Sequence, residues 1–491
     1  MYLLGLDLGS SSVKASLLDV DTGVCAGSAH YPKSEAAIAS PQPGFAEQNP
    51  ADWYAAACDA VRDAVQQAGA TGADVSAIGI AYQMHGLVCV DANQEVVRPA
   101  IIWCDSRAVP YGDAAMEALG SEQCLSHLLN SPGNFTATKL AWIKEHEPEH
   151  FARTHKILLP GDWLAMMLTG QANTTASGLS EGMLWDFKNE QPADFLLEHL
   201  GFSPDVLAER VPTFGPQGEL NARAANDLGL SAGIPVTYRG GDQPNNALSL
   251  NVMRPGEIAA TAGTSGVVYG VSEDVAYDPQ SRVNTFLHVN HTEAAPRLGV
   301  LLCVNGSGIL KSWTRRLMGG DLSYDTLNDL AGQAPVGSDG LVVLPFGNGA
   351  ERLLGNRRIG ASFNGLDLNR HDRTHVCRAV QESVVFAFRY GLDIMRELGI
   401  VPSVIRAGKA NMFLSDVFCE TLSAVSGARI ELYETDGALG AARGAGMGAG
   451  IYASADEAFS SLEQVTSYAP AEQGHIAAYE AWKAQLERAL A

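Results

Sequence analysis

Four short segments carry residues whose types and spacing could act on a phosphate group or a polyhydroxylated ligand. The first is the run Asp7-Leu-Gly-Ser-Ser-Ser-Val-Lys14. Glycine lets a ligand approach the backbone, successive N–H groups in a tight turn bind anions, and Lys14 can offset phosphate charge. Asp7, at a predicted strand end, could hold Mg²⁺ directly or through water. A plain hairpin turn with a capping aspartate explains the same residues about as well, and the spacing is not that of a Walker loop.

The second segment is Gly240-Gly241-Asp242, which precedes a predicted helix. As a general base, Asp242 would accept a hydroxyl proton during phosphoryl transfer, and the two glycines would leave room for a substrate beside it. The alternative is a helix N-cap, where aspartate is common. Spacing alone favours the cap.

The third and fourth segments each follow a predicted strand: Gln83-Met84-His85-Gly86 and Trp103-Cys104-Asp105-Ser106-Arg107. A flat ring can stack on the apolar face of a sugar, and charged groups can bind its hydroxyls. Strand ends are a common place for ligand contacts in α/β proteins. The alternatives are a buried structural histidine, a packing methionine and a surface ion pair between Asp105 and Arg107.

Two histidine pairs, His288/His291 and His371/His375, have the spacing of metal ligands. No acidic partner motif stands near either pair. We therefore expect both pairs to be structural or solvated rather than a metal site.

The elements that must position these residues alternate between strand and helix, which favours the α/β class. The last predicted helix should place Ile476, Tyr479, Trp482 and Leu486 on one apolar stripe. The apolar runs and turn residues predict strands at 2–7, 13–19, 75–81, 88–90, 100–103, 235–238, 257–262, 267–271 and 404–407, and helices at 50–68, 243–250, 375–397, 437–450 and 473–491.

A strand–turn–strand pattern with a Gly/Ser/Thr turn occurs twice, at 2–19 and again at 257–271. Two such hairpins, one opening each half, suggest a duplicated architecture with a cleft between the halves, although so short a match also arises by chance. We place the boundary near Arg254. This gives an N-terminal domain of residues 1–250 and a C-terminal domain of residues 251–491.

The amino-acid composition argues against some classes of function. The 491 residues are 46 % hydrophobic, and 33 Lys+Arg against 55 Asp+Glu give a formal net charge of −22. This charge argues against a general nucleic-acid or membrane-surface binder. The eight cysteines form no Cys-x-x-Cys pair, and neither a leader pattern nor a long apolar run is evident. We expect a cytoplasmic protein with a small-molecule partner and no nucleic acid or membrane, and we leave a homodimer open.

Six motifs of the chain, which follow one another in the order of the family, resemble those of the FGGY family of carbohydrate kinases. The motif Gln-Met-His-Gly is most like that of the xylulose kinases within the family. The resemblance runs from Leu4 to about Tyr452. Its motifs are Gly5-Leu-Asp-Leu-Gly-Ser-Ser-Ser-Val-Lys14, Gln83-Met-His-Gly86, Ala100-Ile-Ile-Trp-Cys-Asp-Ser-Arg107, Gly240-Gly-Asp-Gln243, Ala262-Gly-Thr-Ser-Gly266 and Asp436-Gly-Ala-Leu-Gly-Ala-Ala442.

This resemblance implies a two-domain, actin-like ATPase (ribonuclease H-like) α/β fold with a central cleft. It also implies ATP-dependent phosphorylation of D-xylulose to its 5-phosphate. Asp242 would be the catalytic base and Asp7 would organise Mg²⁺. Met84, His85, Trp103, Asp105 and Gln243 would bind the sugar. The implied ATP-binding residues are Gly9, Ser10, Ser11, Ser12, Lys14, Gly263, Thr264, Ser265, Asn305, Gly306, Gly408 and Ala410.

The chain departs from the family pattern in two places. The family usually has a Gly-Gly-Gly-Ala turn near the adenosine, where this chain has Ala407-Gly-Lys-Ala410, so Lys409 either covers the nucleotide or faces water. Asn245 and Asn246 are more polar than the small residues expected there. Two other functions stay open: an FGGY kinase for another pentulose or polyol, and a non-catalytic ATPase of the actin or chaperone type.

Overall fold

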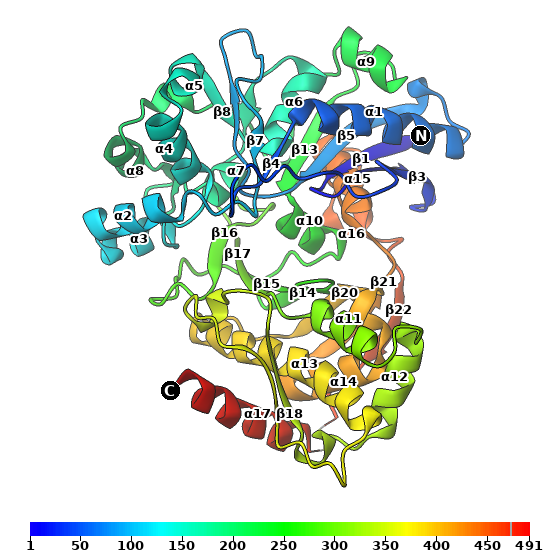
Figure 1. The fold of residues 1–491 in the computed structure, drawn as a ribbon. Helices are drawn as coiled ribbons and strands as arrows, with labels where there is room; N and C mark the ends of the chain where they lie inside the picture. Colours follow the sequence, from blue (N-terminus) through cyan, green and yellow to red (C-terminus); the bar gives the residue numbers. More distant parts are fainter. Residues whose placement is uncertain (472–473) are drawn as a thin grey trace. The chain divides into compact units, whose positions relative to one another are not determined.

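The computed structural model describes residues 1–471 and 474–491, and the chain forms two compact units (Figure 1). The first unit comprises Met1–Asn251, Phe286–Leu298 and Thr435–Leu462. The second comprises Val252–Thr285, Gly299–Glu434 and Glu463–Ala491. The chain therefore passes between the units several times, and each unit is described below by itself.

The first unit is built on a five-stranded sheet with the strand order β13-β5-β1-β2-β3. Strands β1, β2 and β3 are antiparallel neighbours, whereas β5 and β13 run parallel to β1. The strands of the whole first unit, inside and outside this sheet, are β1 (Tyr2–Leu8), β2 (Val13–Asp19), β3 (Cys25–Tyr31), β4 (Glu47–Gln48), β5 (Val75–Tyr82), β6 (Val88–Val90), β7 (Ala100–Ile101), β8 (Lys156–Leu158), β9 (Asn173–Thr174), β10 (Trp185–Asp186), β11 (Gln191–Pro192), β12 (Glu209–Arg210) and β13 (Val236–Gly241). Its helices are α1 (Pro50–Gln67), α2 (Val109–Leu119), α3 (Ser121–Leu128), α4 (Thr136–His146), α5 (Pro148–Arg153), α6 (Pro160–Thr169), α7 (Ala176–Glu181), α8 (Asp194–Leu200), α9 (Ala222–Leu228), α10 (Asp242–Ser249), α15 (Gly437–Gly448) and α16 (Ala455–Ala458).

Glycines in the sheet let two helices pack closely on its opposite faces. A Cβ atom on Gly5 would lie 1.7 Å from the carbonyl oxygen of Ala438 in α15, and one on Gly79 would lie 2.0 Å from that of Ala441. On Gly27 of β3, a Cβ would instead meet α1, 2.2 Å from the carbonyl oxygen of Ala64. The glycine- and alanine-rich composition of α15 completes this packing, because small side chains allow the backbones to approach.

The second unit is built on a seven-stranded sheet with the order β16-β17-β15-β14-β20-β21-β22. Strands β14 and β15 form an antiparallel hairpin, and β20 and β21 continue the sheet parallel to β14. Strand β16 (Asn284–Leu287) spans the boundary between the two units. The other strands of the second unit, inside and outside this sheet, are β14 (Glu257–Ala262), β15 (Gly266–Ser272), β17 (Leu298–Val304), β18 (Val342–Phe346), β19 (Gly360–Asn364), β20 (Val404–Gly408), β21 (Arg429–Tyr433) and β22 (Gln464–Tyr468). Its helices are α11 (Gly308–Leu317), α12 (Tyr324–Gln333), α13 (Arg373–Glu397), α14 (Asp416–Ser426) and α17 (His475–Leu490).

The two sheets repeat one topology. The order β3-β2-β1-β5-β13 in the first unit corresponds to β17-β15-β14-β20-β21 in the second. In each sheet a hairpin is followed by two strands parallel to its first strand. The duplicated architecture predicted from the two Gly/Ser/Thr hairpins is confirmed at the level of sheet topology.

The predicted stripe of the C-terminal helix was partly wrong. Tyr479, Trp482 and Leu486 are buried as expected, but Ile476 is 38 % exposed and His475 is buried in its place. The helix starts at His475, and Gln473, its predicted first residue, lies outside the described residues. Tyr479 packs in the hydrophobic core of the second unit, and its hydroxyl is satisfied there because it donates a hydrogen bond to Asp393 Oδ2 at 2.7 Å.

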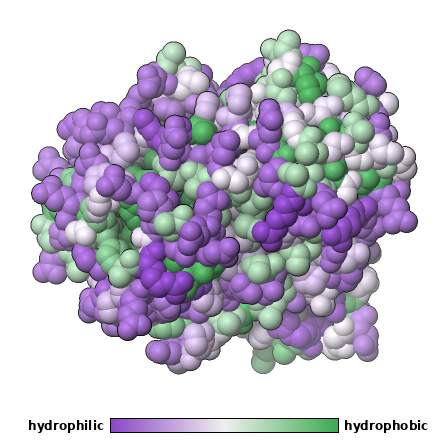
Figure 2. All heavy atoms as spheres, turned by 90° about the horizontal axis from the view of Figure 1, so that it is seen from above, coloured by the Kyte–Doolittle hydropathy of each residue, from purple (hydrophilic) through white to green (hydrophobic). Residues whose placement is uncertain are grey.

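The face shown in Figure 2 is mostly hydrophilic, with hydrophobic residues in scattered groups. Single exposed hydrophobic residues are normal on a folded protein. Among the described residues, no helix combines the length and the apolar character that crossing a bilayer requires.

Candidate active site

The first Gly/Ser hairpin is held at its base by an ion pair. Its turn is closed by a hydrogen bond from Gly9 N to Ser12 O at 3.0 Å. Lys14 Nζ lies 2.5 Å from Asp436 Oδ2, while the same carboxylate caps α15 by accepting a hydrogen bond from Leu439 N at 2.9 Å. Lys14 is thus anchored beside the turn by Asp436, a residue that was not predicted to have a role in the site.

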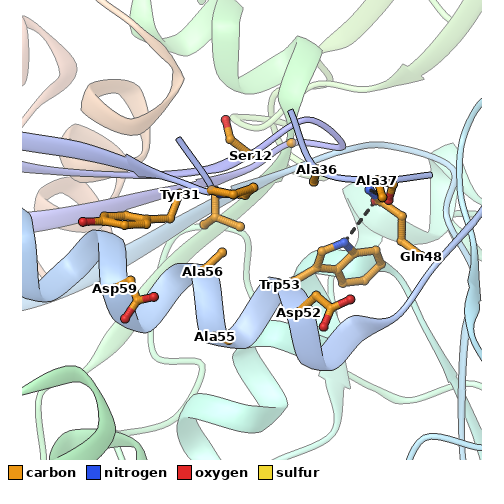
Figure 3. A pocket seen from close by; sticks show the side chains of 13 residues that line it. Ser12, Tyr31, Ala36, Ala37, Gln48, Asp52, Trp53, Ala55, Ala56 and Asp59 are labelled. Carbon is orange, nitrogen blue, oxygen red and sulfur yellow. Dashed lines mark hydrogen bonds between the residues drawn. The ribbon is translucent and has the colours of Figure 1, made fainter. Parts of the chain in front are cut away.

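Gln48 connects the first hairpin with the loop that contains His85. Its Nε2 donates to Ser10 O at 2.7 Å, and its Oε1 accepts from Gln83 Nε2 at 3.3 Å and from Trp53 Nε1 at 3.1 Å. Figure 3 shows Gln48 and Trp53 at one side of a cavity of about 340 Å³ that is also lined by Gly9 and Ser12. Gln48 was not predicted as a site residue, because nothing in its local sequence distinguishes it.

Two other carboxylates lie close enough to Asp7 to repel its charge. Burial raises the pKa of Asp7 to about 7, and the charges of Asp242 and Asp436 add to the rise, whereas Lys14 opposes it. Asp7 touches the start of α15: a Cβ on Gly437 would lie 2.1 Å from Asp7 Oδ2. A bound cation would relieve this repulsion.

Asp242 is not the helix cap that spacing alone favoured. The N-cap of α10 is Gly241, no side chain caps this helix, and Asp242 is its first residue. Asp242 is half-buried, and its carboxylate accepts a hydrogen bond from Gln243 Nε2 at 3.4 Å. Burial raises its pKa to about 6, which is near the value that suits a general base at neutral pH.

The two glycines before Asp242 serve the protein's own packing, so the predicted room for a substrate at these positions was wrong. A Cβ on Gly241 would lie 2.6 Å from Met84 Cγ, and one on Gly240 would lie 2.8 Å from the hydroxyl of Tyr238 and 2.9 Å from Val289 Cγ1. Met84 is therefore held directly against the backbone that leads to Asp242.

The residues predicted to bind a sugar differ in exposure. Met84 is 5 % exposed, His85 is partly buried, and Trp103 is 52 % exposed. Trp103 Nε1 lies 3.3 Å from the hydroxyl oxygen of Ser10, to which it donates. Trp103 thus lies against the first hairpin, and Met84 lies against the backbone of Gly241, just before Asp242.

Asp105 is fully buried. Its carboxylate accepts hydrogen bonds from Ala46 N at 2.6 Å and from the guanidinium of Arg107, which stacks on the ring of Phe45 at 3.8 Å. The ion pair between Asp105 and Arg107 exists, but it is buried, not on the surface as the alternative reading expected. Its visible effect is to fix the loop that carries Trp103.

The second hairpin is supported by the start of α11. Gly308 N donates to Gly263 O at 2.8 Å, and Ile309 N donates to Thr264 O at 3.1 Å. A Cβ on Gly263 would have Asn411 Nδ2 as its nearest neighbour, at 3.7 Å. The structure therefore gathers residues 263–265, the start of α11 and the turn after β20 within the second unit.

Asn305 and Gly306 lead into α11. Glu351, a buried residue that the sequence analysis missed, accepts a hydrogen bond from Asn305 N at 3.1 Å, and burial raises its pKa to about 7. The Asn305 side chain donates to Ala350 O at 2.8 Å. A Cβ on Gly306 would lie 1.7 Å from Pro345 O, so this glycine is needed for packing.

The two departures from the family pattern have local explanations. Gly408 ends β20, and Ala410 N donates to Gly408 O at 2.8 Å, which turns Lys409 outward to an exposed position. Asn245 is buried and donates from Nδ2 to Gly437 O at 2.8 Å, so it ties α10 to α15. Asn246 is only partly buried.

The donor set around Asp7 fits Mg²⁺, which prefers carboxylate oxygen and usually keeps several waters. Within residues 1–471 and 474–491, no group of three or more His, Cys, Asp or Glu side chains is arranged to hold a metal directly. His375 Nδ1 contacts Asp372 Oδ1 at 3.0 Å at the start of α13, and His291 Nδ1 accepts from Arg297 N at 3.2 Å. These contacts are structural.

Comparison with known proteins identifies the family. The model of the FGGY family of carbohydrate kinases, N-terminal domain, matches residues 2–249, and that of the C-terminal domain matches residues 258–449. The chain belongs to the FGGY family of carbohydrate kinases. The xylulose kinase of Escherichia coli is 31 % identical over 479 residues, which cover 97 % of this chain and 94 % of that protein.

Solved structures of this family share the fold. The xylulose kinase of Rhodospirillum rubrum matches with a TM-score of 0.88 and 25 % identity over 99 % of both chains. Glycerol kinase of Plasmodium falciparum, solved with ADP, matches with a TM-score of 0.90 and 19 % identity over 100 % of this chain and 98 % of that one. The fold is the two-domain α/β fold of the FGGY, actin-like ATPases, with two mixed sheets, as the sequence predicted.

Proposed function

We propose that this FGGY kinase transfers the γ-phosphoryl group of ATP to D-xylulose and forms D-xylulose 5-phosphate. The observation that carries the proposal is Asp242: its carboxylate caps no helix, its pKa is raised to about 6, and Met84 is packed against the glycine that precedes it. The E. coli relative, a xylulose kinase, supports this choice of sugar.

In this proposal, residues of the first unit bind the sugar and residues of the second unit bind most of the nucleotide. Met84, His85 and Trp103 contact the sugar, while Asp105 and Gln243 fix its surroundings. The phosphates lie against the backbone N–H groups of residues 9–12 and 263–265, which suit anions. Lys14 adds positive charge at the first hairpin. Residues 305–306, Gly408 and Ala410 lie on the nucleotide side.

The chemical step needs one proton acceptor in the right place. The sugar hydroxyl attacks the γ-phosphorus, the bond between that phosphorus and the oxygen of the departing ADP breaks, and the hydroxyl proton passes to Asp242. Mg²⁺, when bound, would neutralise phosphate charge, and Asp7 would hold it through water. Holding the hydroxyl beside the phosphate supplies much of the rate enhancement.

A coupled assay of ADP release with a panel of ketopentoses and polyols tests this function. We expect ADP release to require a sugar and kcat/KM to be highest for D-xylulose. A higher value for another pentulose or for a polyol such as glycerol would reassign the substrate within the family. ADP release that no sugar stimulates would favour the non-catalytic ATPase.

A further inference from the structure

His85 is held in a backbone conformation that few non-glycine residues adopt. Its φ angle is +62°, in the left-handed region, where a side chain is strained unless its surroundings hold it in place. The next residue, Gly86, is packed against Pro160, because a Cβ there would lie 2.6 Å from Pro160 Cγ. The residues that fix His85 must therefore supply specific contacts.

Glu181, the last residue of α7, holds His85 at two points. Its Oε2 accepts a hydrogen bond from His85 N at 3.0 Å. Its backbone carbonyl oxygen lies 2.9 Å from His85 Nδ1, and Oε2 lies 3.5 Å from the same nitrogen. A carbonyl oxygen can only accept, so Nδ1 carries a proton and, in the neutral ring, Nε2 is the acceptor.

Glu181 acts in these contacts as a hydrogen-bonding group more than as a charge. Its side chain is only 3 % exposed. Burial holds the pKa of this carboxyl well above its ordinary value, and the nearby charges of Asp242 and Asp162 act in the same direction. A protonated carboxyl keeps an oxygen that can accept the hydrogen bond from His85 N.

Lys139 in α4 holds the backbone carbonyl group of His85. Its side chain is fully buried, and Nζ donates to His85 O at 2.7 Å and to Ile102 O at 3.1 Å. Ile102 immediately precedes Trp103, so one ammonium group joins both loops predicted to bind the sugar. Burial lowers the pKa of Lys139 to about 8.

Two aromatic rings complete the surroundings of the imidazole. The His85 ring meets Phe135 edge-on, with centroids 4.8 Å apart, and lies 5.3 Å from the ring centroid of Phe286. The ring plane, the ring tautomer and the backbone of His85 are therefore all set by neighbours. None of these neighbours was selected from the sequence as a site residue.

We propose that Glu181 and Lys139 are positioning residues that set the sugar preference of this kinase by holding His85 and its loop in place. The inference deepens the proposed function and rests on it. With its backbone and ring orientation fixed, the imidazole meets the sugar in one orientation, which favours a sugar hydroxyl of one configuration. A change of configuration at a single carbon then leaves a buried polar group badly paired, and such mismatches discriminate strongly.

The test compares D-xylulose with its C3 epimer, D-ribulose, in steady-state kinetics of Glu181→Ala, Glu181→Gln and Lys139→Met. We expect Glu181→Ala and Lys139→Met to raise KM for D-xylulose about tenfold, as for a lost buried hydrogen bond, and to reduce the preference over D-ribulose at least fivefold. KM for ATP should stay within about twofold. Glu181→Gln keeps the length and the acceptor oxygen, so it should retain the preference.

Glu382→Ala is the matched control for the loss of a buried carboxyl. Glu382 is 2 % exposed, accepts from Gly337 N at 3.0 Å and pairs with Arg378 at 2.7 Å in α13 of the second unit. This variant should melt at a lower temperature but keep the ratio of kcat/KM for the two sugars. If Glu181→Ala does not fold, Glu181→Asp, which shortens the side chain by one methylene, replaces it.

The outcomes separate this inference from the function on which it rests. If the wild-type protein phosphorylates no pentulose, the proposed function fails, whatever the variants do. If it phosphorylates D-xylulose and the preference ratio survives Glu181→Ala and Lys139→Met, the positioning role is overturned. An equal loss of preference in Glu181→Gln, or in Glu382→Ala, would overturn it as well, since charge or general destabilisation would then be the cause.

Discussion

The two Gly/Ser/Thr hairpins occupy equivalent places in two sheets of the same topology, but they differ in their surroundings. The first hairpin lies among charges: Lys14 is paired with Asp436, and Asp7 at the end of β1 interacts with Asp242. The second hairpin, residues 263–265, is supported by backbone hydrogen bonds from Gly308 and Ile309 at the start of α11. One strand arrangement thus supports two kinds of site.

The repeated topology therefore determines where each hairpin lies in its sheet, but not which chemical groups surround it. Carboxylates with raised pKa values suit proton transfer and cation binding, and the first unit holds Asp7 and Asp242 of this kind. A turn of small residues in which a Cβ on Gly263 would have its nearest neighbour only at 3.7 Å suits close approach by phosphate. We therefore propose that the first unit carries out the chemistry and the second binds the nucleotide.

The largest expected effect is that of Asp242→Asn. This change removes the proton acceptor but keeps the size of the side chain, so kcat should fall about 10²–10⁴-fold. Binding of D-xylulose and of a non-hydrolysable ATP analogue should persist. A coupled assay and calorimetry measure both. A variant that keeps near-normal kcat would remove Asp242 from the role of base.

Gly263→Val and Gly5→Val sharpen the comparison between the units. A Cβ on Gly263 has its nearest neighbour at 3.7 Å, whereas a Cβ on Gly5 would lie 1.7 Å from Ala438 O. Gly263→Val should fold normally and raise KM for ATP about 10–100-fold, because the side chain blocks the approach of phosphate to backbone N–H groups. Gly5→Val should fail to fold or melt far lower. Thermal melting and KM for ATP check both, and a normal KM in Gly263→Val would contradict the account.

The smallest expected effect is a change in the melting temperature of Asp7→Asn. The folded pKa of Asp7 is about 7, above the ordinary 3.8, so its favourable contribution to stability is present below pH 4 and is lost as pH rises through 7. Asp7→Asn should therefore raise Tm at pH 8 by about 2–4 °C, as expected for about 1 kcal/mol in a domain of this size. The gain should shrink at pH 5.

Asp19→Asn is the control of opposite sign for that experiment. Hydrogen bonds from Thr22 lower the pKa of Asp19, so its contribution is present at neutral pH and is lost as the pH falls below 4. This variant should lower Tm at pH 8. A Tm gain for Asp7→Asn that is the same at pH 8 and pH 5 would show that carboxylate repulsion is not its cause.

Much of the fold could be predicted from the sequence, because its strongest signals are local. The strands of both hairpins follow continuous apolar runs, and the turns between them are glycine and serine or threonine. The predicted apolar stripe of α17 was wrong at Ile476 and His475, because the helical period alone does not determine which of two adjacent residues faces the core. That choice depends on tertiary packing.

The candidate site was predictable only where a motif carried it. Asp242 could be named, but the role of helix cap could not be excluded until Gly241 was seen to occupy the cap position. Glu181 and Lys139 stood in segments with no distinctive pattern, and their roles come from contacts with His85 across 96 and 54 residues of sequence. Such long-range contacts leave no local signal.

The central claim, that the first unit binds the sugar and the second unit binds most of the nucleotide, is tested most directly by calorimetric titration of two variants. His85→Ala alters the first unit and Gly263→Val the second, and each is titrated with D-xylulose and with a non-hydrolysable ATP analogue. The account predicts that His85→Ala loses affinity for the sugar alone, and Gly263→Val for the nucleotide alone. If either variant, binding each ligand in the absence of the other, loses affinity for both, the division between the two units is contradicted.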